Sequence, residues 1–216
     1  MSNATAPENF NSQFKNYLLN DLTYPIIYET LYYDENKYLI EENQIIESIY
    51  IIESGVVVEK KRQIISSFLG REESIGLEGI LQVKVGATTS VMTLTKTIVY
   101  RVSIQSIQEK MLERPIGYKI LNELLVHQIT ALTNRLTDTD TNHDKTLHVL
   151  ERLAFLYGQE KNDAIYIKKF FTKKMIANYL QVSYGTILSS CRSLVAEGIL
   201  HDELHGMILY PANTSR

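Results

Sequence analysis

The chain has 216 residues, is 44% hydrophobic, carries a net charge of −3 and contains one cysteine and no tryptophan. This length fits one or two globular domains, and a single cysteine excludes an intramolecular disulfide framework and a four-cysteine zinc or iron–sulfur site. The sequence shows neither a signal-peptide pattern nor an apolar run long enough to cross a bilayer, so we expect a cytoplasmic protein without a membrane partner.

The first half of the sequence has the pattern of a compact β unit. Phe10, Phe14, Tyr17 and Leu18 lie at helical spacing and predict an amphipathic helix packed on that unit. Short runs rich in Tyr, Ile, Val and Thr then alternate with glycine-containing turns, which is typical of an antiparallel barrel or sandwich. The expected strands cover residues 28–33, 37–40, 48–52, 56–60, 63–69, 88–95 and 97–102.

A helical pattern replaces the strands near Ile104, and Pro115 then opens a longer helix. About 22 residues after Pro115 would give roughly 33 Å of helix. Its apolar positions recur at spacings of three and four, as expected of an ordinary core helix or of one that also faces a second copy. The length favours an interface, whose candidate residues are Leu121, Leu124, Leu125, Ile129, Leu132 and Leu136.

Polar side chains that compete for backbone hydrogen bonds predict a hinge at Thr137–His143. A further amphipathic helix ends at Gly158, and a short strand precedes residues 172–195, which contain two helical patterns separated by about three residues. Thr172 and Ser183 are suited to cap these two helices. Two expected strands, residues 199–201 and 207–210, flank a turn at 202–206, which completes the order of a winged helix-turn-helix. A small α/β subdomain that touches no nucleic acid is the alternative.

The net charge hides a difference between the two parts of the chain. Residues 1–143 carry a net −5 and residues 144–216 a net +2, and residues 173–195 hold three basic residues and no acidic one. The outer face of the second helix is short, polar and free of carboxylates, as suits close contact with another surface. This face contains Tyr184, Gly185, Thr186, Ser189 and Arg192.

Three segments in this order resemble the family of the cyclic-AMP receptor protein and FNR. They are Tyr50-Ile-Ile-Glu-Ser-Gly-Val-Val-Val58, Ser74-Ile-Gly-Leu-Glu-Gly-Ile-Leu81 and Ile176-Ala-Asn-Tyr-Leu-Gln-Val-Ser-Tyr-Gly-Thr-Ile-Leu188, and the last is most similar to the YeiL-type subgroup. The resemblance spans residues 24–212 and implies an α+β fold: a β-roll sensor like a cyclic nucleotide-binding domain (residues 1–110), a dimerisation helix (111–137), a hinge (138–143) and a winged helix-turn-helix (144–216). It also implies phosphate contacts by Thr172, Lys173, Lys174, Ser183 and Thr186.

The effector pocket that the resemblance implies lacks the family's ligand groups. The candidate residues are Gly76, Leu77, Glu78, Ala87 and Thr88. Leu77 stands where nucleotide-binding members place a ribose-binding glutamate, and Ala87 and Thr88 stand where they place an Arg-Ser pair on the phosphate. A leucine accepts no hydroxyl hydrogen bond, and without a cation the phosphate would be desolvated unpaired. We therefore expect no cyclic AMP.

Other family cofactors are not expected either. The FNR branch holds an iron–sulfur cluster with several cysteines, whereas Cys191 is alone and reads as a small buried residue of the second helix. His127 reads as a surface residue rather than a haem ligand. The remaining histidines, His143, His148, His201 and His205, show no metal-ligand spacing, so we expect no metal.

The leading hypothesis is a homodimeric transcription regulator that binds a near-palindromic site on double-stranded DNA and contacts RNA polymerase. Its two reading helices would enter successive major grooves about 34 Å apart. Tyr184, Gly185 and Ser189 replace the family's base-reading residues, so its familiar operator is not expected. A ligand-binding or protein-interaction module, with the winged helix as docking surface, is the alternative. No nucleophile–base pair, carboxylate pair or phosphate loop points to an enzyme. The sequence specifies neither the effector nor activation or repression.

Overall fold

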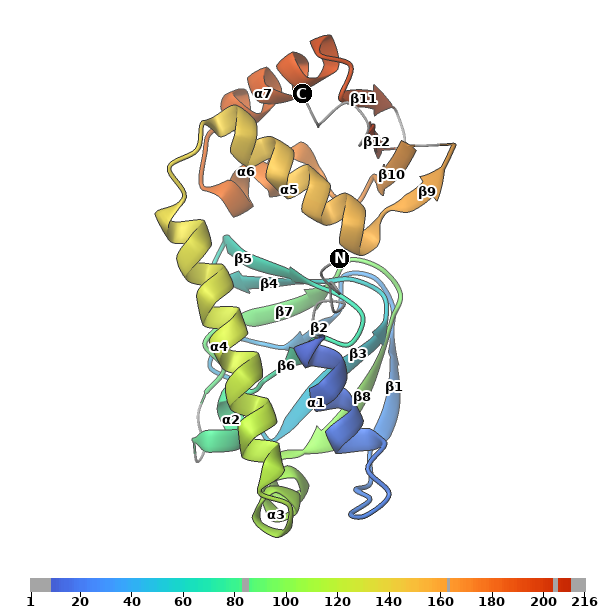
Figure 1. Ribbon diagram of the computed structural model, residues 1–216, viewed down its shortest axis with the longest axis vertical. Helices are drawn as coiled ribbons and strands as arrows, with labels where there is room; N and C mark the ends of the chain where they lie inside the picture. The colour runs from blue at the N-terminus through green and yellow to red at the C-terminus, as the bar shows by residue number, and fades with distance from the viewer. Residues whose placement is uncertain (1–8, 83–85, 163, 204–205, 211–216) are drawn as a thin grey trace, which may run out of the picture. The chain divides into compact units, whose positions relative to one another are not determined.

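A computed structural model describes residues 9–82, 86–162, 164–203 and 206–210 of the chain (Figure 1). The chain divides into two compact units. Unit 1 comprises Met1–Val57 and Leu69–Asp138, and unit 2 comprises Val58–Phe68 and Thr139–Arg216. Unit 2 therefore includes a short hairpin segment from the first half of the sequence, which the pattern of strands did not predict.

The alternating runs of the first half of the sequence form two antiparallel sheets, as predicted, and one hairpin of the second sheet falls mostly within residues 58–68 of unit 2. One sheet has the strand order β1-β8-β3-β6, and a second has the order β2-β7-β4-β5. The strands are β1 (Glu29–Tyr33), β2 (Tyr38–Ile40), β3 (Ser48–Ser54), β4 (Val57–Lys61), β5 (Ile64–Leu69), β6 (Ser74–Ile75), β7 (Ser90–Thr93) and β8 (Thr97–Ser103). All seven predicted strands are present, whereas the two-residue strand β6 is too short to show a periodic pattern.

The core of unit 1 is aliphatic. Ile49, Ile51 and Ile52 of β3 are fully buried together with Val99 and Val102 of the neighbouring strand β8. Gly55 ends β3 with a φ of +98°, and a Cβ there would lie 2.5 Å from Thr97 Oγ1. Both the backbone conformation and the lack of space therefore require a glycine at this turn.

Helices complete unit 1. They are α1 (Phe10–Leu19), α2 (Glu78–Leu81), α3 (Ile104–Glu113) and α4 (Ile116–Thr137). The long helix α4 begins directly after Pro115 and has 22 residues, as its pattern predicted. Figure 1 shows α1 beside α4, and the Tyr17 hydroxyl donates to the Arg114 carbonyl at 3.0 Å. Gly117 makes room for this ring, since a Cβ at that position would lie 2.3 Å from the Tyr17 hydroxyl oxygen.

The part of unit 2 after the hinge has the predicted order of two helices joined by a short turn and followed by a strand hairpin. Its elements are α5 (Asn142–Tyr157), β9 (Gln159–Lys161), β10 (Ala164–Lys168), α6 (Lys173–Leu180), α7 (Tyr184–Ala196), β11 (Leu200–Glu203) and β12 (Gly206–Leu209). Its sheet has the order β11-β12-β10-β9, in which the exposed, polar edge strand β9 was not predicted. Residues 204–205 of the predicted turn lie outside the described residues. In the described ranges, no helix has the length and apolar character that a membrane span needs.

Candidate nucleic-acid interface and effector pocket

The candidate helix-turn-helix comprises α6 and α7, and each of these helices has the predicted capping residue at its N-terminus. The Thr172 hydroxyl accepts from the Met175 amide at 3.2 Å, and the Ser183 hydroxyl accepts from the Thr186 amide at 3.0 Å. Gln181 lies between the helices in the left-handed conformation, with a φ of +57°. Two capped helix N-termini, each with a partial positive charge, are therefore separated by only a short stretch of sequence.

The two faces of α7 differ in burial as its spacing predicted. Ile187, Cys191 and Leu194 are buried in unit 2. Burial raises the pKa of the Cys191 thiol, so this residue behaves as a small core side chain rather than as a reactive one. The opposite face is open, with Tyr184 45% exposed and Gly185, Ser189 and Arg192 also exposed. The exposed face therefore contains hydroxyl groups, a glycine and a guanidinium, without a carboxylate.

Gly185 is a helical glycine that the protein's own packing does not require. A Cβ built there would have only the Ser183 hydroxyl oxygen within 4 Å, at 3.7 Å, which is an ordinary contact. Its φ is not among the positive values of the chain. Glycine costs a helix roughly 0.5–1 kcal/mol relative to alanine. The missing side chain thus leaves free space on the outer surface of α7.

The charge on α6 differs from the sequence expectation. The Lys173 ammonium forms an ion pair with the Asp202 carboxylate of the wing strand β11, and only 18% of the Lys173 side chain is exposed. Residues 173–195 contain no acidic residue, yet Asp202 of β11 lies beside them. The local charge of +3 therefore overstates the net positive charge of this surface. Lys174 and Arg192 are exposed, and they are the basic residues of this segment best placed to meet a phosphate.

The candidate effector pocket is a tight apolar turn. Gly76 has a φ of +84°, and Leu77 and Glu78 start the short helix α2 rather than an extended turn. Leu77 and Ala87 are buried in the core cluster of unit 1. The polar residues meet each other, since the Thr88 hydroxyl lies 3.5 Å from a Glu78 carboxylate oxygen. In the described parts of this turn, residues 74–82 and 86–90, there is no lysine or arginine.

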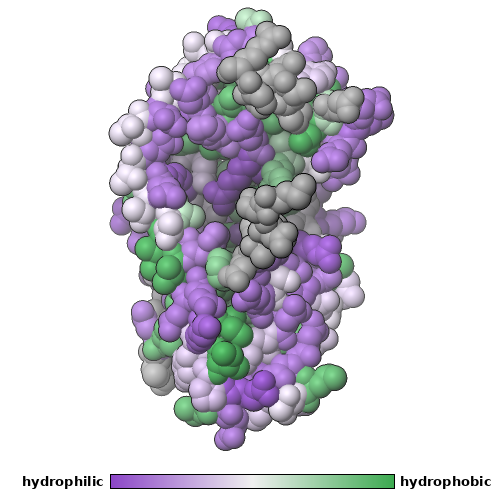
Figure 2. Space-filling view, viewed as in Figure 1, coloured by the Kyte–Doolittle hydropathy of each residue, from purple (hydrophilic) through white to green (hydrophobic). Residues whose placement is uncertain are grey.

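The predicted dimer residues fall into two groups along α4. Leu121 and Leu124 are core residues of unit 1, because they are fully buried beneath α1 and the β-roll within a single chain. Ile129 and Leu136 are 61% and 79% exposed, and Leu132 is also exposed, whereas Leu125 is half-buried. The candidate dimer interface is therefore limited to the second half of α4. Figure 2 shows hydrophobic side chains at the surface along the course of this helix.

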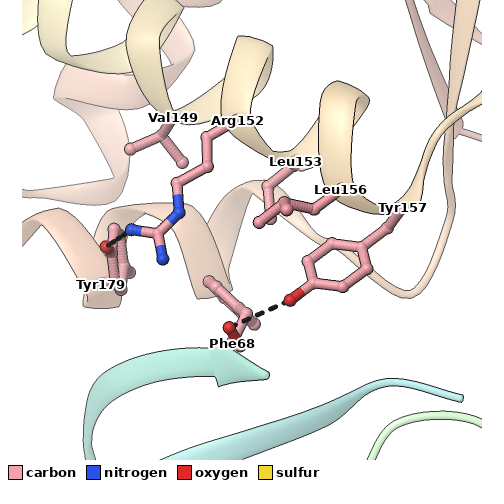
Figure 3. A pocket seen from close by; sticks show the side chains of 7 residues that line it. All are labelled: Phe68, Val149, Arg152, Leu153, Leu156, Tyr157 and Tyr179. Carbon is pink, nitrogen blue, oxygen red and sulfur yellow. Dashed lines mark hydrogen bonds between the residues drawn. The ribbon is translucent and has the colours of Figure 1, made fainter. Parts of the chain in front are cut away.

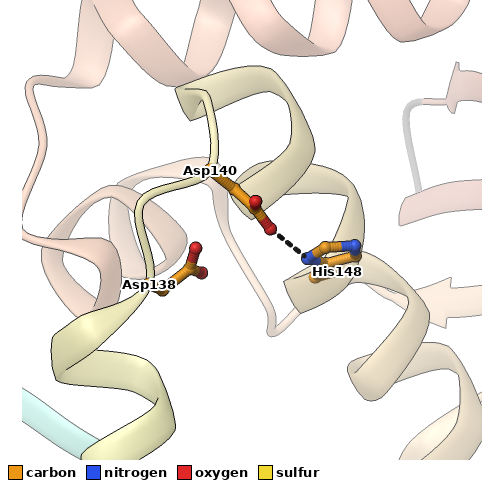
Figure 4. Close-up of side chains that lie close together, drawn as sticks. All are labelled: Asp138, Asp140 and His148. Atoms are coloured by element: carbon orange, nitrogen blue, oxygen red, sulfur yellow. Dashed lines mark ion pairs between the residues drawn. The ribbon is translucent and has the colours of Figure 1, made fainter.

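The hinge joins α4 to α5 and contains several charged side chains. Figure 4 shows Asp138, Asp140 and His148, whose ligand atoms lie within 4.8 Å of one another, although the spacing of the histidines had suggested no metal ligands. Asp140 Oδ2 and His148 Nδ1 are 3.6 Å apart and account for this proximity as an ion pair. Next to them, the Thr141 hydroxyl donates to the Asp144 carboxylate and lowers its pKa.

Comparisons with known proteins agree with this architecture. Residues 30–114 match the family model of the cyclic nucleotide-binding domain. FixK2 from Bradyrhizobium japonicum has a similar structure, with a TM-score of 0.74 and 14% identity over 88% of this chain and 95% of that chain. CLP from Xanthomonas campestris, a c-di-GMP-responsive global regulator, gives a TM-score of 0.71 and 14% identity over 85% and 94% of the two chains.

A cyclic nucleotide-binding domain containing protein from Listeria monocytogenes is similar over a larger share of the chain. Its TM-score is 0.66 and its identity 17%, over 94% of this chain and 96% of that chain. No curated protein sequence matches the chain. The chain therefore has an α+β fold similar to those of these solved structures, with an N-terminal β-roll that matches the cyclic nucleotide-binding domain and a C-terminal helical region.

Proposed function

We propose that the protein is a homodimeric transcription regulator that inserts α7 into the major groove of DNA. The observation that carries the proposal is the exposed outer face of α7, which has no carboxylate and has free space at Gly185. A major groove admits a helix only when the helix surface approaches the base edges closely. The glycine and the short hydroxyl side chains of Ser189 and Thr186 allow that approach, whereas Tyr184 offers a hydroxyl to a base or a phosphate.

The N-termini of α6 and α7 also support an orientation in which these helices face the DNA. Thr172 and Ser183 cap α6 and α7, and the amides of a helix N-terminus attract phosphate. Lys174 adds an exposed positive charge in the first turn of α6, and it lies outside the ion pair that occupies Lys173. These contacts fix the register on DNA without reading its sequence.

The second copy would bind the exposed apolar side chains of α4. Ile129, Leu132 and Leu136 follow one another at helical spacing, and their burial between two helices would be favourable by about 1.5–3 kcal/mol for each fully buried side chain. Two helix-turn-helix units would then occupy successive major grooves of a near-palindrome, about 34 Å apart. The YeiL-type subgroup and a contact with RNA polymerase remain predictions.

The signal that controls such a regulator is proposed to be something other than a cyclic nucleotide. The residues at the family's ligand positions do not fit one, because Leu77 and Ala87 belong to the apolar core. A ribose hydroxyl would find no acceptor at Leu77, and a cyclic phosphate would find no cation in the described parts of the turn. A thermal-shift titration with cyclic AMP and cyclic GMP should therefore leave the melting temperature unchanged, and a clear rise would contradict this proposal.

The test of DNA binding is a fluorescence-anisotropy titration across a salt series, using the promoter region of the protein's own gene. A binding free energy carried by phosphate contacts makes log K fall linearly with log salt, by about 0.9 per phosphate neutralised. Lys174→Glu should weaken binding and reduce this slope by about 2 per dimer. Lys96→Glu, an exposed charge change in unit 1, is the matched control and should leave affinity unchanged.

A salt-independent affinity, or equal effects of the two variants, would contradict DNA binding through α6 and α7. Absence of any DNA binding by a correctly folded dimer would favour the alternative of a ligand-binding or interaction module.

A further inference from the structure

Strand β11 brings a carboxylate to the N-terminal end of α6. Lys173 is the first residue of this helix, directly after the capping residue Thr172, and its ammonium is paired with the Asp202 carboxylate of β11. The Lys173 side chain is 18% exposed, whereas that of Asp202 is 47% exposed. An exposed carboxylate thus occupies the lysine at the point where α6 is proposed to meet a phosphate.

The two elements that carry the pair are fixed within unit 2. In α6, Ile176 is buried, and the Tyr179 hydroxyl accepts from Arg152 Nη1 of α5 at 3.2 Å (Figure 3). In β11, Asp202 pairs in register with Met207 of β12, which is also buried. The positions of both charges therefore follow from the packing of the elements on which they stand.

Both charges also act on the neighbouring helix α7. Burial is the main cause of the raised pKa of the Cys191 thiol; the Lys173 charge opposes this rise, and the Asp202 charge adds to it. The pair therefore lies near α7 as well as α6, and a change in its charge is felt at both helices of the candidate helix-turn-helix.

A DNA phosphate and the Asp202 carboxylate are anions of the same kind for Lys173. An ammonium is a compact charge that either anion can bind, and the partial positive charge at the start of α6 attracts both. Partly exposed ion pairs are weak, so the pair can open. A phosphate that took Lys173 from Asp202 would leave an unpaired carboxylate close to the DNA, where like charges repel.

We propose that Asp202 is an affinity-setting residue that competes with DNA phosphate for Lys173. This inference rests on the proposed function, because the competing anion is a phosphate of the DNA. Phosphate contacts are the same on every sequence, whereas the exposed face of α7 would meet the base edges. By holding Lys173, Asp202 lowers affinity for all DNA and leaves discrimination between sites to α7.

The test compares Asp202→Asn with Glu203→Gln in the full chain. Both variants remove one exposed carboxylate from β11, but successive side chains of a strand point to opposite faces, so only Asp202 faces Lys173. In anisotropy titrations on the promoter DNA, Asp202→Asn should raise the affinity of the dimer at least about twofold. The dependence of log K on log salt should steepen by about 2 per dimer, because each released lysine neutralises one more phosphate. Glu203→Gln should leave this slope unchanged.

A second variant identifies the lysine that is released. Lys173→Gln combined with Asp202→Asn should return the salt slope to the native value, because neither member of the pair is then charged. Circular dichroism checks that each variant is folded. A double variant that keeps the steeper slope, equal slopes for Asp202→Asn and Glu203→Gln, or an unchanged affinity of Asp202→Asn would overturn the proposal.

Acylation of lysines in the absence of DNA tests the ion pair separately from the proposed function. With acetic anhydride and mass spectrometry, Lys173 of the native protein should react more slowly than the exposed Lys174. Asp202→Asn should speed the reaction of Lys173 by about two- to fivefold, and Glu203→Gln should not. An unchanged rate at Lys173 would overturn the pairing. A native protein with the expected acylation pattern that binds no DNA would instead overturn the proposed function, and with it the competition.

Discussion

Gly185→Ala separates the stability of α7 from its fit to DNA. The added methyl group would meet only the Ser183 hydroxyl oxygen, at 3.7 Å, so it causes no clash within the protein. Replacing a helical glycine by alanine stabilises a helix by roughly 0.5–1 kcal/mol, and a first-turn position lies at the low end of that range. For a protein of this size the melting temperature should rise by about 1–4 °C, measured by circular dichroism.

The same methyl group should weaken DNA binding, because it occupies the space that lets α7 approach the base edges. The expected loss is about tenfold, comparable to one mismatched base pair in a specific site. Ser193→Ala, at the other end of the exposed face of α7, is the control and should change DNA affinity little. A more stable Gly185→Ala protein with unchanged affinity would refute the assignment of Gly185 to the DNA surface. A less stable one would refute the packing argument.

Three further predictions concern other parts of the chain. Ile129→Lys combined with Leu136→Lys should give a monomer in light scattering, since both side chains are exposed in a single chain, and an unchanged dimer mass would place the interface elsewhere. Phe68→Ala should lower the free energy of unfolding by about 3–5 kcal/mol in denaturant titrations, because it leaves a cavity; an equal effect of Ala at the exposed Phe155 would contradict this. The Lys15 ammonium lies 2.6 Å from a Glu53 carboxylate oxygen and lowers the pKa of that carboxyl below its ordinary value of 4.5. The ion pair therefore stabilises the fold above that pH, and its contribution is lost as the pH falls through the lowered pKa. Lys15→Met should raise the pKa of Glu53 in an NMR titration, and an unchanged pKa would contradict the pairing.

Local signals in the sequence predicted the elements that local interactions determine. Thr172 and Ser183 are suited to cap helices, and both do, because a capping bond joins residues three apart. Pro115 marked the start of α4 for a similar local reason, since proline tolerates the first turn of a helix. The short strand β6 and the polar edge strand β9 have no such signal and depend on pairing with neighbouring strands.

Contacts between distant residues could not be read from spacing. The apolar stripe of α4 looked uniform, yet Leu121 and Leu124 serve the core of unit 1, and only the exposed residues further along remain for a partner. Lys173 and Asp202 are 29 residues apart, so their ion pair is absent from a local count of charge. Asn178 was one polar residue in a helix, and its hydrogen bond with the Ile65 amide joins residues 113 positions apart in the sequence.

The most direct test of the central claim is selection of bound DNA from a random pool of double-stranded oligonucleotides, about three helical turns long. A homodimer that reads DNA with α7 should enrich an inverted repeat whose half-site centres lie about 34 Å, or one helical turn, apart. Gly185→Ala should change the enriched half-site or abolish enrichment. Failure of the native dimer to enrich any sequence, or enrichment of a single unrepeated site, would contradict the account.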